Sequence, residues 1–269
     1  MPVELDPSRR YDMPASFGPS SIPARTQVKR AESLVLSAVT DRTAVERLVP
    51  AHFTVPEAPS LTVAHMAYHD IDYLGGRSYN EVVVSVSARH DGGGQAIAAS
   101  LALVLWVDQP GALIAGREFM GLPKILGRIS DLEDRPDGVR FTCAEYDVPL
   151  LVGSATGWTP LDQDRLARLN GKAADVQTFG WKYIAAAGGG SDVDHPLVNS
   201  MRWSYEQAWT GQGDFLFHPV AFADAPLSAA AARQLAMLPV TGPVRAFRGI
   251  GQATIDRAAT RRIGHVGGV

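Results

Sequence analysis

The sequence predicts a mainly β protein with a few helices, in which antiparallel strands form a closed or sandwiched sheet. Several segments alternate apolar and polar residues with period two and are rich in β-branched residues. Turn-forming residues separate them, most clearly DGGGQ at 91–95 and DRPDG at 134–138. Strands and helices do not alternate along the chain as they would in a parallel sheet. No internal repeat divides the chain.

The chain begins with residues 1–25, whose Pro, Ser and Arg content predicts an extended arm. One domain is expected over residues 26–257, followed by a tail over 258–269. Seven segments have strand character, and the third and fourth should form a hairpin across the turn at 91–95. These segments are residues 28–39, 60–74, 78–90, 96–108, 139–148, 197–209 and 244–256.

Two helices are predicted near the ends of this series. Residues 40–50 should form a short helix whose first turn is capped by Thr40 or Asp41. Residues 227–238 should form another, with Ser228 near its N-terminal cap and a proline just beyond its end.

A third helix is expected after the strand at 139–148. Thr159 precedes Pro160, which suits the first helical position because proline has no N–H to leave unpaired. Gly171 would end this helix as a left-handed cap.

Composition excludes several classes of function. The 269 residues carry a net charge of −3 with no strongly basic segment, so a nucleic-acid partner has little electrostatic support. The N-terminus lacks the apolar core of a secretory signal, and the longest apolar run, residues 96–107, is about half of a membrane helix. Cys143 is the single cysteine, so no intrachain disulfide forms, and its place in a strand does not suit a nucleophile. We therefore expect a cytoplasmic protein without a membrane partner.

One lysine, in the stretch GREFMGLPKILG at 116–127, has neighbours that are unusual for a charged residue. Lys124 follows a proline and has apolar neighbours, which suits either a solvated loop charge or a buried amine. A free lysine has a pKa near 10.4, whereas attack on a carbonyl requires the neutral amine. Burial can lower a lysine pKa by about 3–5 units. If Lys124 is buried, Schiff-base chemistry is the use that its surroundings favour.

The stretch resembles the acetoacetate decarboxylase family. In that family Gly-Arg-Glu, a short spacer and Pro-Lys-Lys carry the imine-forming lysine, and here Gly116, Arg117 and Glu118 match the first part and Pro123 and Lys124 the second. Further matches follow in the family's order over about residues 28–240. They are RLVP at 47–50, MAYHD at 66–70, YNE at 79–81 and EQAWTG at 206–211.

The resemblance implies a closed antiparallel β-barrel or cone around an apolar cavity, a homo-oligomer, and no cofactor or metal. It implies that Lys124 is the nucleophile and that Glu81 is the nearest acid or base. Acetoacetate decarboxylase is itself the established example of a lysine activated by desolvation or by a neighbouring cation. His65 and Leu122 are further candidates for contact with the substrate.

Two neighbours of the lysine have a candidate role of their own. Arg117 and Glu118 match the family motif and are counted with the substrate-binding residues. An ion pair between them that shapes the lysine loop is the interpretation we favour.

The chain departs from the family pattern at three positions. The second lysine is Ile125, which removes one cation and should increase desolvation. The family has a glutamate five residues before its His-Asp pair, and this chain has Ala64 at that position. The arginine thought to hold the substrate carboxylate corresponds to Arg30, displaced by one position.

His65 and His69 are four residues apart and would share one face of a strand. No Glu or Cys completes a recognisable ligand set, so we expect no metal site.

These departures favour an aldolase-dehydratase that joins pyruvate and an aldehyde through a lysine imine. A decarboxylase acting on acetoacetate or another 3-oxo acid is the alternative within the same class of lyases. A non-catalytic barrel that binds an apolar ligand is the alternative from another class.

Overall fold

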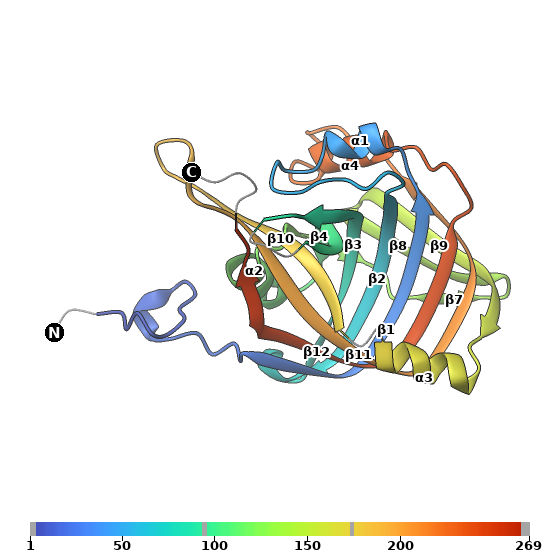
Figure 1. Cartoon of the computed structure of the whole chain (residues 1–269), viewed down its shortest axis with the longest axis horizontal. Helices are drawn as coiled ribbons and strands as arrows, with labels where there is room; N and C mark the ends of the chain where they lie inside the picture. The colour runs from blue at the N-terminus through green and yellow to red at the C-terminus, as the bar shows by residue number, and fades with distance from the viewer. Residues whose placement is uncertain (1–3, 93–95, 173–174, 265–269) are drawn as a thin grey trace.

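The computed structural model describes residues 4–92, 96–172 and 175–264. The turn expected at 91–95 therefore lies partly outside the described residues. Figure 1 shows long strands curving around the centre of the molecule, with α1 and α4 at one end and the N-terminal segment extending to one side. Mainly β architecture is confirmed.

Within the described residues, the strands form one twelve-stranded sheet. They are β1 (Arg25–Val39), β2 (Ser60–Ile71), β3 (Arg77–His90), β4 (Ile97–Val107), β5 (Lys124–Leu126), β6 (Arg128–Ile129), β7 (Glu133–Arg135), β8 (Gly138–Glu145), β9 (Val148–Pro160), β10 (Asp175–Ala185), β11 (Ser191–Phe217) and β12 (Arg245–Arg262).

The sheet closes into a ring. Its order is β10–β4–β3–β2–β1–β12–β11, and β11 pairs again with β10. The other half of β11 pairs with β9, which continues the sheet through β8 to β6 and β7. The expected hairpin between β3 and β4 is confirmed, as is strand structure within all seven predicted segments.

The strand predicted at 139–148 is two strands. The chain turns between β8 and β9 at Tyr146, whose φ of 52° lies in the left-handed region. Of β9 only the first residue, Val148, falls in a predicted segment, and β5, β6, β7 and β10 have no counterpart among these segments.

The helices are short. They are α1 (Arg42–Glu46), α2 (Pro110–Met120), α3 (Gln163–Lys172) and α4 (Ala229–Ala236), with 3-10 turns at Ala15–Phe17 and Asp72–Leu74. The Asp41 carboxylate accepts a hydrogen bond from the N–H of Ala44, so the predicted cap of α1 is confirmed. No described helix is long and apolar enough to cross a membrane.

The predicted start and end of the third helix were wrong. β9 continues through Pro160, and α3 begins only at Gln163. The carboxylate of Asp162 accepts a hydrogen bond from the N–H of Arg165 and so caps the first turn. Gly171 lies inside the helix and is not among the residues with positive φ, so it is not a left-handed cap.

The expectation of a purely antiparallel sheet also fails at two places. β10 and β5 both pair with β4 in the parallel direction. α2 connects β4 to β5, so this part of the chain is a strand–helix–strand unit. The sequence gives little sign of it because β5 has only three residues.

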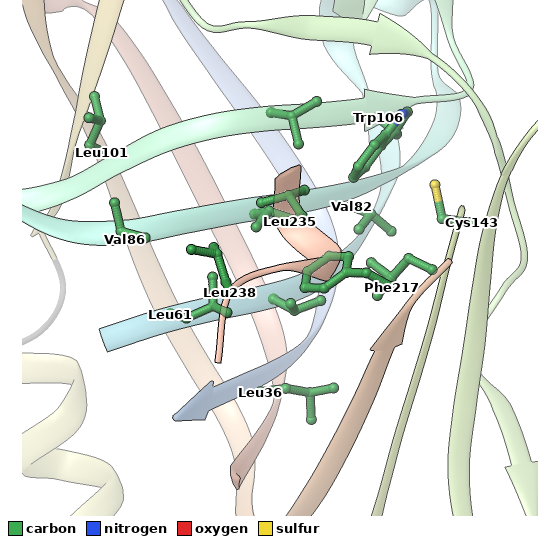
Figure 2. Packing of buried hydrophobic residues seen from close by; sticks show 14 of the residues in the cluster. Leu36, Leu61, Val82, Val86, Leu101, Trp106, Cys143, Phe217, Leu235 and Leu238 are labelled. Carbon is green, nitrogen blue, oxygen red and sulfur yellow. The ribbon is translucent and has the colours of Figure 1, made fainter. Parts of the chain in front are cut away.

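Two apolar clusters share the inside of the molecule. The main core contains the buried residues Leu36, Leu61, Val82, Val84, Val86, Leu101, Trp106, Phe141, Cys143, Phe217, Leu235 and Leu238, most of which Figure 2 labels. Burial raises the pKa of the Cys143 thiol well above its usual range, so it stays protonated and unreactive. The second cluster, here the site cluster, contains Val28, Ala31, Tyr68, Ile71, Tyr79, Ala102, Leu105, Val107, Ala112, Met120, Leu122, Trp203, Ala253 and Ile255.

Candidate active site

Lys124 is the first residue of β5, and it is buried, with 5% of its surface exposed. α2 ends at Gly121, whose φ of 60° suits a residue without a side chain. The carbonyl of Pro123 then accepts a hydrogen bond from the N–H of Leu105 at 3.1 Å, which attaches the segment to β4. The lysine is thus fixed by the helix end on one side and by the sheet on the other.

β10 and β11 together hold the end of α2 in place. The side-chain amide of Asn199, on β11, donates to the carbonyl of Met120 at 3.0 Å, and Lys182 Nζ donates to the carbonyl of Glu118 at 2.6 Å. A Cβ atom on Gly180 would lie 2.4 Å from the Met120 carbonyl oxygen. Glycine at this position therefore lets the helix end approach the strand closely.

Lys124 Nζ donates a hydrogen bond to Glu81 Oε2 at 2.5 Å. Glu81 projects from β3 and is also 5% exposed. A buried charge pair of this kind is costly to desolvate, and moving one proton from nitrogen to oxygen removes both charges. The contact therefore holds a proton donor and a proton acceptor against each other in a buried site.

A small cavity of about 30 Å³ adjoins the pair, which is the share of volume that one water occupies in the liquid. Its walls come from β2, β3, β5, β11, β12, α2 and the turn after β2. The lining residues are Tyr68, Tyr73, Tyr79, Glu81, Ala112, Ala115, Gly116, Met120, Leu122, Lys124, Met201, Ile255 and Arg257.

Three tyrosines give the cavity neutral polar groups. Burial raises the pKa of Tyr68 and Tyr79 well above the usual value, and the negative charge of Glu81 adds to the effect. Burial likewise raises the pKa of Tyr73 to about 12. All three phenols stay protonated at neutral pH. Lys124 Nζ lies 5.7 Å from the centroid of the Tyr79 ring, within the range of a cation–π contact.

Arg257, on β12, was missed by the sequence analysis, although it lines the cavity and is 4% exposed. Residues 251, 253, 255 and 257 of β12 are all buried, so strand alternation places Arg257 on the same face as Ile255. This alternation was the available signal, but the strand predicted from sequence ended at residue 256.

Arg30 lies elsewhere. A register shift between Val28 and Ala31, where β1 pairs with β12, leaves both Lys29 and Arg30 exposed. Without this bulge, alternation would have turned Arg30 to the same side as Val28. Arg30 is not a lining residue of the cavity.

His65 is fully buried but faces the main core. Its Nε2 lies 2.9 Å from the carbonyl oxygen of Ser130, and its ring centroid is 5.1 Å from that of Phe141. Burial lowers the pKa of His65, so the ring is neutral. Nδ1 of His69 contacts Ser78 Oγ at 3.3 Å. Among the described residues, no group of three or more His, Cys, Asp or Glu side chains could hold a metal ion.

The remaining candidates divide between the wall and the frame of the site. Leu122 lines the cavity. Arg117 donates to the main-chain carbonyl of Lys124 at 3.1 Å rather than forming an ion pair with Glu118, which contributes its carbonyl to Lys182. Ile125 packs against the main core, so it does not add to the desolvation of the cavity as expected.

Gly116 gives the lysine side chain its path. A Cβ atom built on Gly116 would lie 2.5 Å from both Cδ and Cε of Lys124. The lysine therefore passes directly over the last turns of α2, and any larger residue at this position would have to displace it. The glycine of the sequence motif thus has a specific steric role.

Comparison with known proteins gives one family. The family model described as acetoacetate decarboxylase matches residues 12–259. None of the curated proteins compared with the chain matches it.

Solved structures share the fold. An acetoacetate decarboxylase aligns with a TM-score of 0.76 at 18% identity, over 96% of this chain and 97% of the other. The acetoacetate decarboxylase of Legionella pneumophila aligns with a TM-score of 0.72 at 18% identity, over 93% and 92%.

A biosynthetic enzyme has the same fold. The enduracididine biosynthesis enzyme MppR, complexed with pyruvate, aligns with a TM-score of 0.69 at 16% identity, over 96% of this chain and 98% of the other. A second structure of MppR holds the condensation product of pyruvate and imidazole 4-carboxaldehyde, and aligns with a TM-score of 0.66 at 17% identity over 99% and 100%.

Proposed function

This chain belongs to the acetoacetate decarboxylase family, and we propose that it is a Schiff-base-forming carbon–carbon lyase that acts on a small oxo acid. The observation that carries the proposal is the buried contact of Lys124 with Glu81 beside a small, mostly apolar cavity. A lysine in this setting has a chemical use that a solvated lysine lacks. Members of this family are enzymes, and the cavity has room for the reacting end of a small substrate only.

The first step is formation of the imine. Glu81 takes a proton from Lys124, and the neutral amine attacks the substrate ketone to form a C–N bond. A proton moves from the attacking nitrogen to the oxygen, and Glu81 then gives its proton to the resulting hydroxyl group, which leaves as water and leaves the protonated imine. The neutral tyrosines Tyr68, Tyr73 and Tyr79 can donate hydrogen bonds to the oxygen that becomes negative during the attack.

The second step uses the protonated imine as an electron sink. Glu81, now a carboxylate, removes a proton from the methyl carbon next to the imine and leaves an enamine. The enamine carbon adds to an aldehyde, whose oxygen takes the proton that Glu81 holds. Loss of water from the adduct gives an unsaturated imine, and hydrolysis of this imine by water releases the product and the amine of Lys124. We favour this aldolase-dehydratase reaction because MppR, a protein of the same fold, is known in complex with pyruvate and with a pyruvate–aldehyde condensation product.

Decarboxylation of a 3-oxo acid is the second candidate. It is favoured by the apolar part of the wall, Ala112, Ala115, Met120 and Leu122, because an apolar site disfavours the charged carboxylate relative to neutral carbon dioxide. The same imine serves both reactions, so one trapping experiment tests their shared basis.

The test is reduction of the imine. The protein is incubated with pyruvate or acetoacetate, treated with borohydride and weighed, both intact and as peptides. We expect an adduct on the peptide that contains Lys124, and none in Lys124→Ala or Lys124→Arg. Lys29→Ala is the matched control, because Lys29 is exposed and paired with Asp70 on the outside.

Each result decides one point. Lys124→Arg keeps a cation beside Glu81, so loss of the adduct in this variant is not due to an unpaired buried carboxylate. Release of carbon dioxide from acetoacetate would favour the decarboxylase. Absence of an adduct with every oxo acid would overturn the lyase proposal in favour of a non-catalytic protein that binds an apolar ligand.

We also propose that the enzyme works as a homo-oligomer in the cytoplasm. The family resemblance supports the oligomer, and the single, reduced thiol of Cys143 suits a reducing compartment.

A further inference from the structure

We propose that Arg257 binds the carboxylate of the substrate and thereby restricts this site to oxo acids whose carboxylate survives the reaction. The inference rests on the proposed function, since it assigns a second contact to the molecule that Lys124 attacks. Arg257 comes from the last strand of the ring, far in sequence from the lysine.

The guanidinium of Arg257 is buried, and the carboxylate of Asp72 interacts with it only at a distance. Its Nη1 donates to the carbonyl oxygen of Pro23 at 3.3 Å and to Thr26 Oγ1 at 2.5 Å. Within the described residues, no carboxylate forms an ion pair with it, and its buried Nε atom has no hydrogen-bond partner. Unpaired buried cations are costly, so a site that retains one is suited to an anion supplied from outside.

The surroundings hold the guanidinium in a fixed position. Its Cζ atom lies 4.8 Å from the centroid of the Tyr73 ring, and the N–H of Arg257 donates to the carbonyl of Ala24 at 2.8 Å. An arginine side chain presents its donors as a planar fork that matches the two oxygens of a carboxylate. A fork held by neutral groups on one side is preorganised to receive a carboxylate on the other.

The cavity joins the two cations. Arg257 and Lys124 line the same small cavity, so one small molecule bound there can contact both side chains. This favours short oxo acids, in which one or two bonds separate the ketone carbon from the carboxylate carbon.

The same contact affects which reaction follows. Loss of carbon dioxide would convert the partner of Arg257 into a neutral molecule and leave the guanidinium unpaired again, which opposes decarboxylation. Reaction at the methyl carbon leaves the carboxylate in place throughout. Arg257 therefore favours a substrate of the pyruvate type, with the carboxylate directly bonded to the ketone carbon.

The experiment compares an acid with a neutral ketone. Borohydride trapping is measured against concentration with pyruvate and with acetone, in which a methyl group replaces the carboxylate. We expect Arg257→Gln to raise the pyruvate concentration needed for half-maximal trapping by about 30-fold or more. Trapping of acetone should change by less than about threefold, because acetone makes no ion pair.

Two further variants complete the design. Arg261→Gln removes an exposed arginine from the same strand and should change neither curve. Arg257→Lys keeps the charge but loses the planar fork, and we expect an intermediate increase with pyruvate alone. This variant retains a cation at the site should Arg257→Gln fail to fold.

The outcomes separate the two proposals. If wild-type protein traps neither ketone, the lyase proposal itself fails. If wild type traps pyruvate and Arg257→Gln traps it at the same concentration, imine formation stands and the role of Arg257 is overturned. Equal losses with pyruvate and acetone in a folded variant would also overturn it, because they would place the effect on the lysine rather than on the carboxylate.

Discussion

The two faces of β3 differ in what they bury. Val82, Val84 and Val86 point into the main core, whereas Tyr79 and Glu81 line the cavity on the opposite side. Burial of apolar side chains stabilises the fold by roughly 1.5–3 kcal/mol for each large residue, but burial of a charge or a phenol must be offset by its partners. The apolar face therefore helps to offset the cost of burying polar groups on the other face.

The same division is seen in the short strand that carries the nucleophile. Lys124 faces the cavity, and the next residue, Ile125, packs against the main core. A slip of one residue in the pairing with β4 would exchange the two side chains. Chemistry at this site thus depends on strand register, which the main core fixes.

The largest expected effect is a loss of stability on removal of a side chain from the main core alone. Phe141→Ala removes a fully buried ring from the main core and should lower the free energy of unfolding by about 3–5 kcal/mol. Urea unfolding measures this change, and Arg140→Ala, at an exposed position on the same strand, should stay within about 0.5 kcal/mol. The trapping rate at Lys124 should be unaltered in the folded variant, and a large fall would show that the two faces are not separable.

The next prediction concerns the site face and depends on pH. The pKa of Tyr73 is raised to about 12 from an ordinary value of 10.0, so the folded protein keeps a proton that the unfolded chain has lost in this interval. Stability from the neutral phenol is complete below pH 10 and is lost as the pH rises toward 12. For this group the loss amounts to at most about 3 kcal/mol.

Tyr73→Phe isolates this contribution, because phenylalanine does not titrate. Urea unfolding at about pH 9 and about pH 11.5 should show a steeper loss of stability in the wild type than in the variant. If wild type and Tyr73→Phe lose stability equally between these pH values, Tyr73 ionises at the same pH in the folded and the unfolded protein, and the prediction is wrong.

The smallest expected effect is on the rate of imine trapping, and it compares two glycines that lie in helices. Gly116→Ala places a methyl group where Lys124 now passes, so imine trapping should slow by about tenfold, or about 1.4 kcal/mol in the barrier. Gly171→Ala, in α3, faces open space and should stabilise the helix by about 0.5–1 kcal/mol without changing the trapping rate. Equal trapping rates in both variants would contradict the steric role of Gly116.

Local patterns in the sequence predicted much of this molecule. Period-two alternation and β-branched residues located β2 and β3, the second of which carries Glu81, but not the three-residue strand β5 that carries Lys124. The motif that contains Lys124 pointed to a buried amine. In the structure this lysine contacts Glu81, which lies on a strand 43 positions earlier in the chain.

Features that depend on distant pairing were less accessible. The bulge that turns Arg30 outward exists only because β1 pairs with β12, and Arg257 reaches the cavity only because the last strand closes beside the first. The fixed φ of Pro160 suits both the first turn of a helix and an extended strand, so the sequence alone did not decide between them. Pairing with Trp209 makes it part of a strand. Propensity alone does not contain this information.

The closure of the ring is short. Among the residues that the structure describes, β10 and β4 are in register at only two residue pairs, Thr178 with Ser100 and Phe179 with Leu101, whereas the other junctions of the ring are much longer. Local opening requires least free energy where few backbone hydrogen bonds must break, so this seam is where the ring should first come apart. Gly180, next to the seam, also supports the end of α2. A transient separation of β10 from β4 would therefore loosen one of the two supports of the nucleophile and leave the pairing of β5 with β4 as the other.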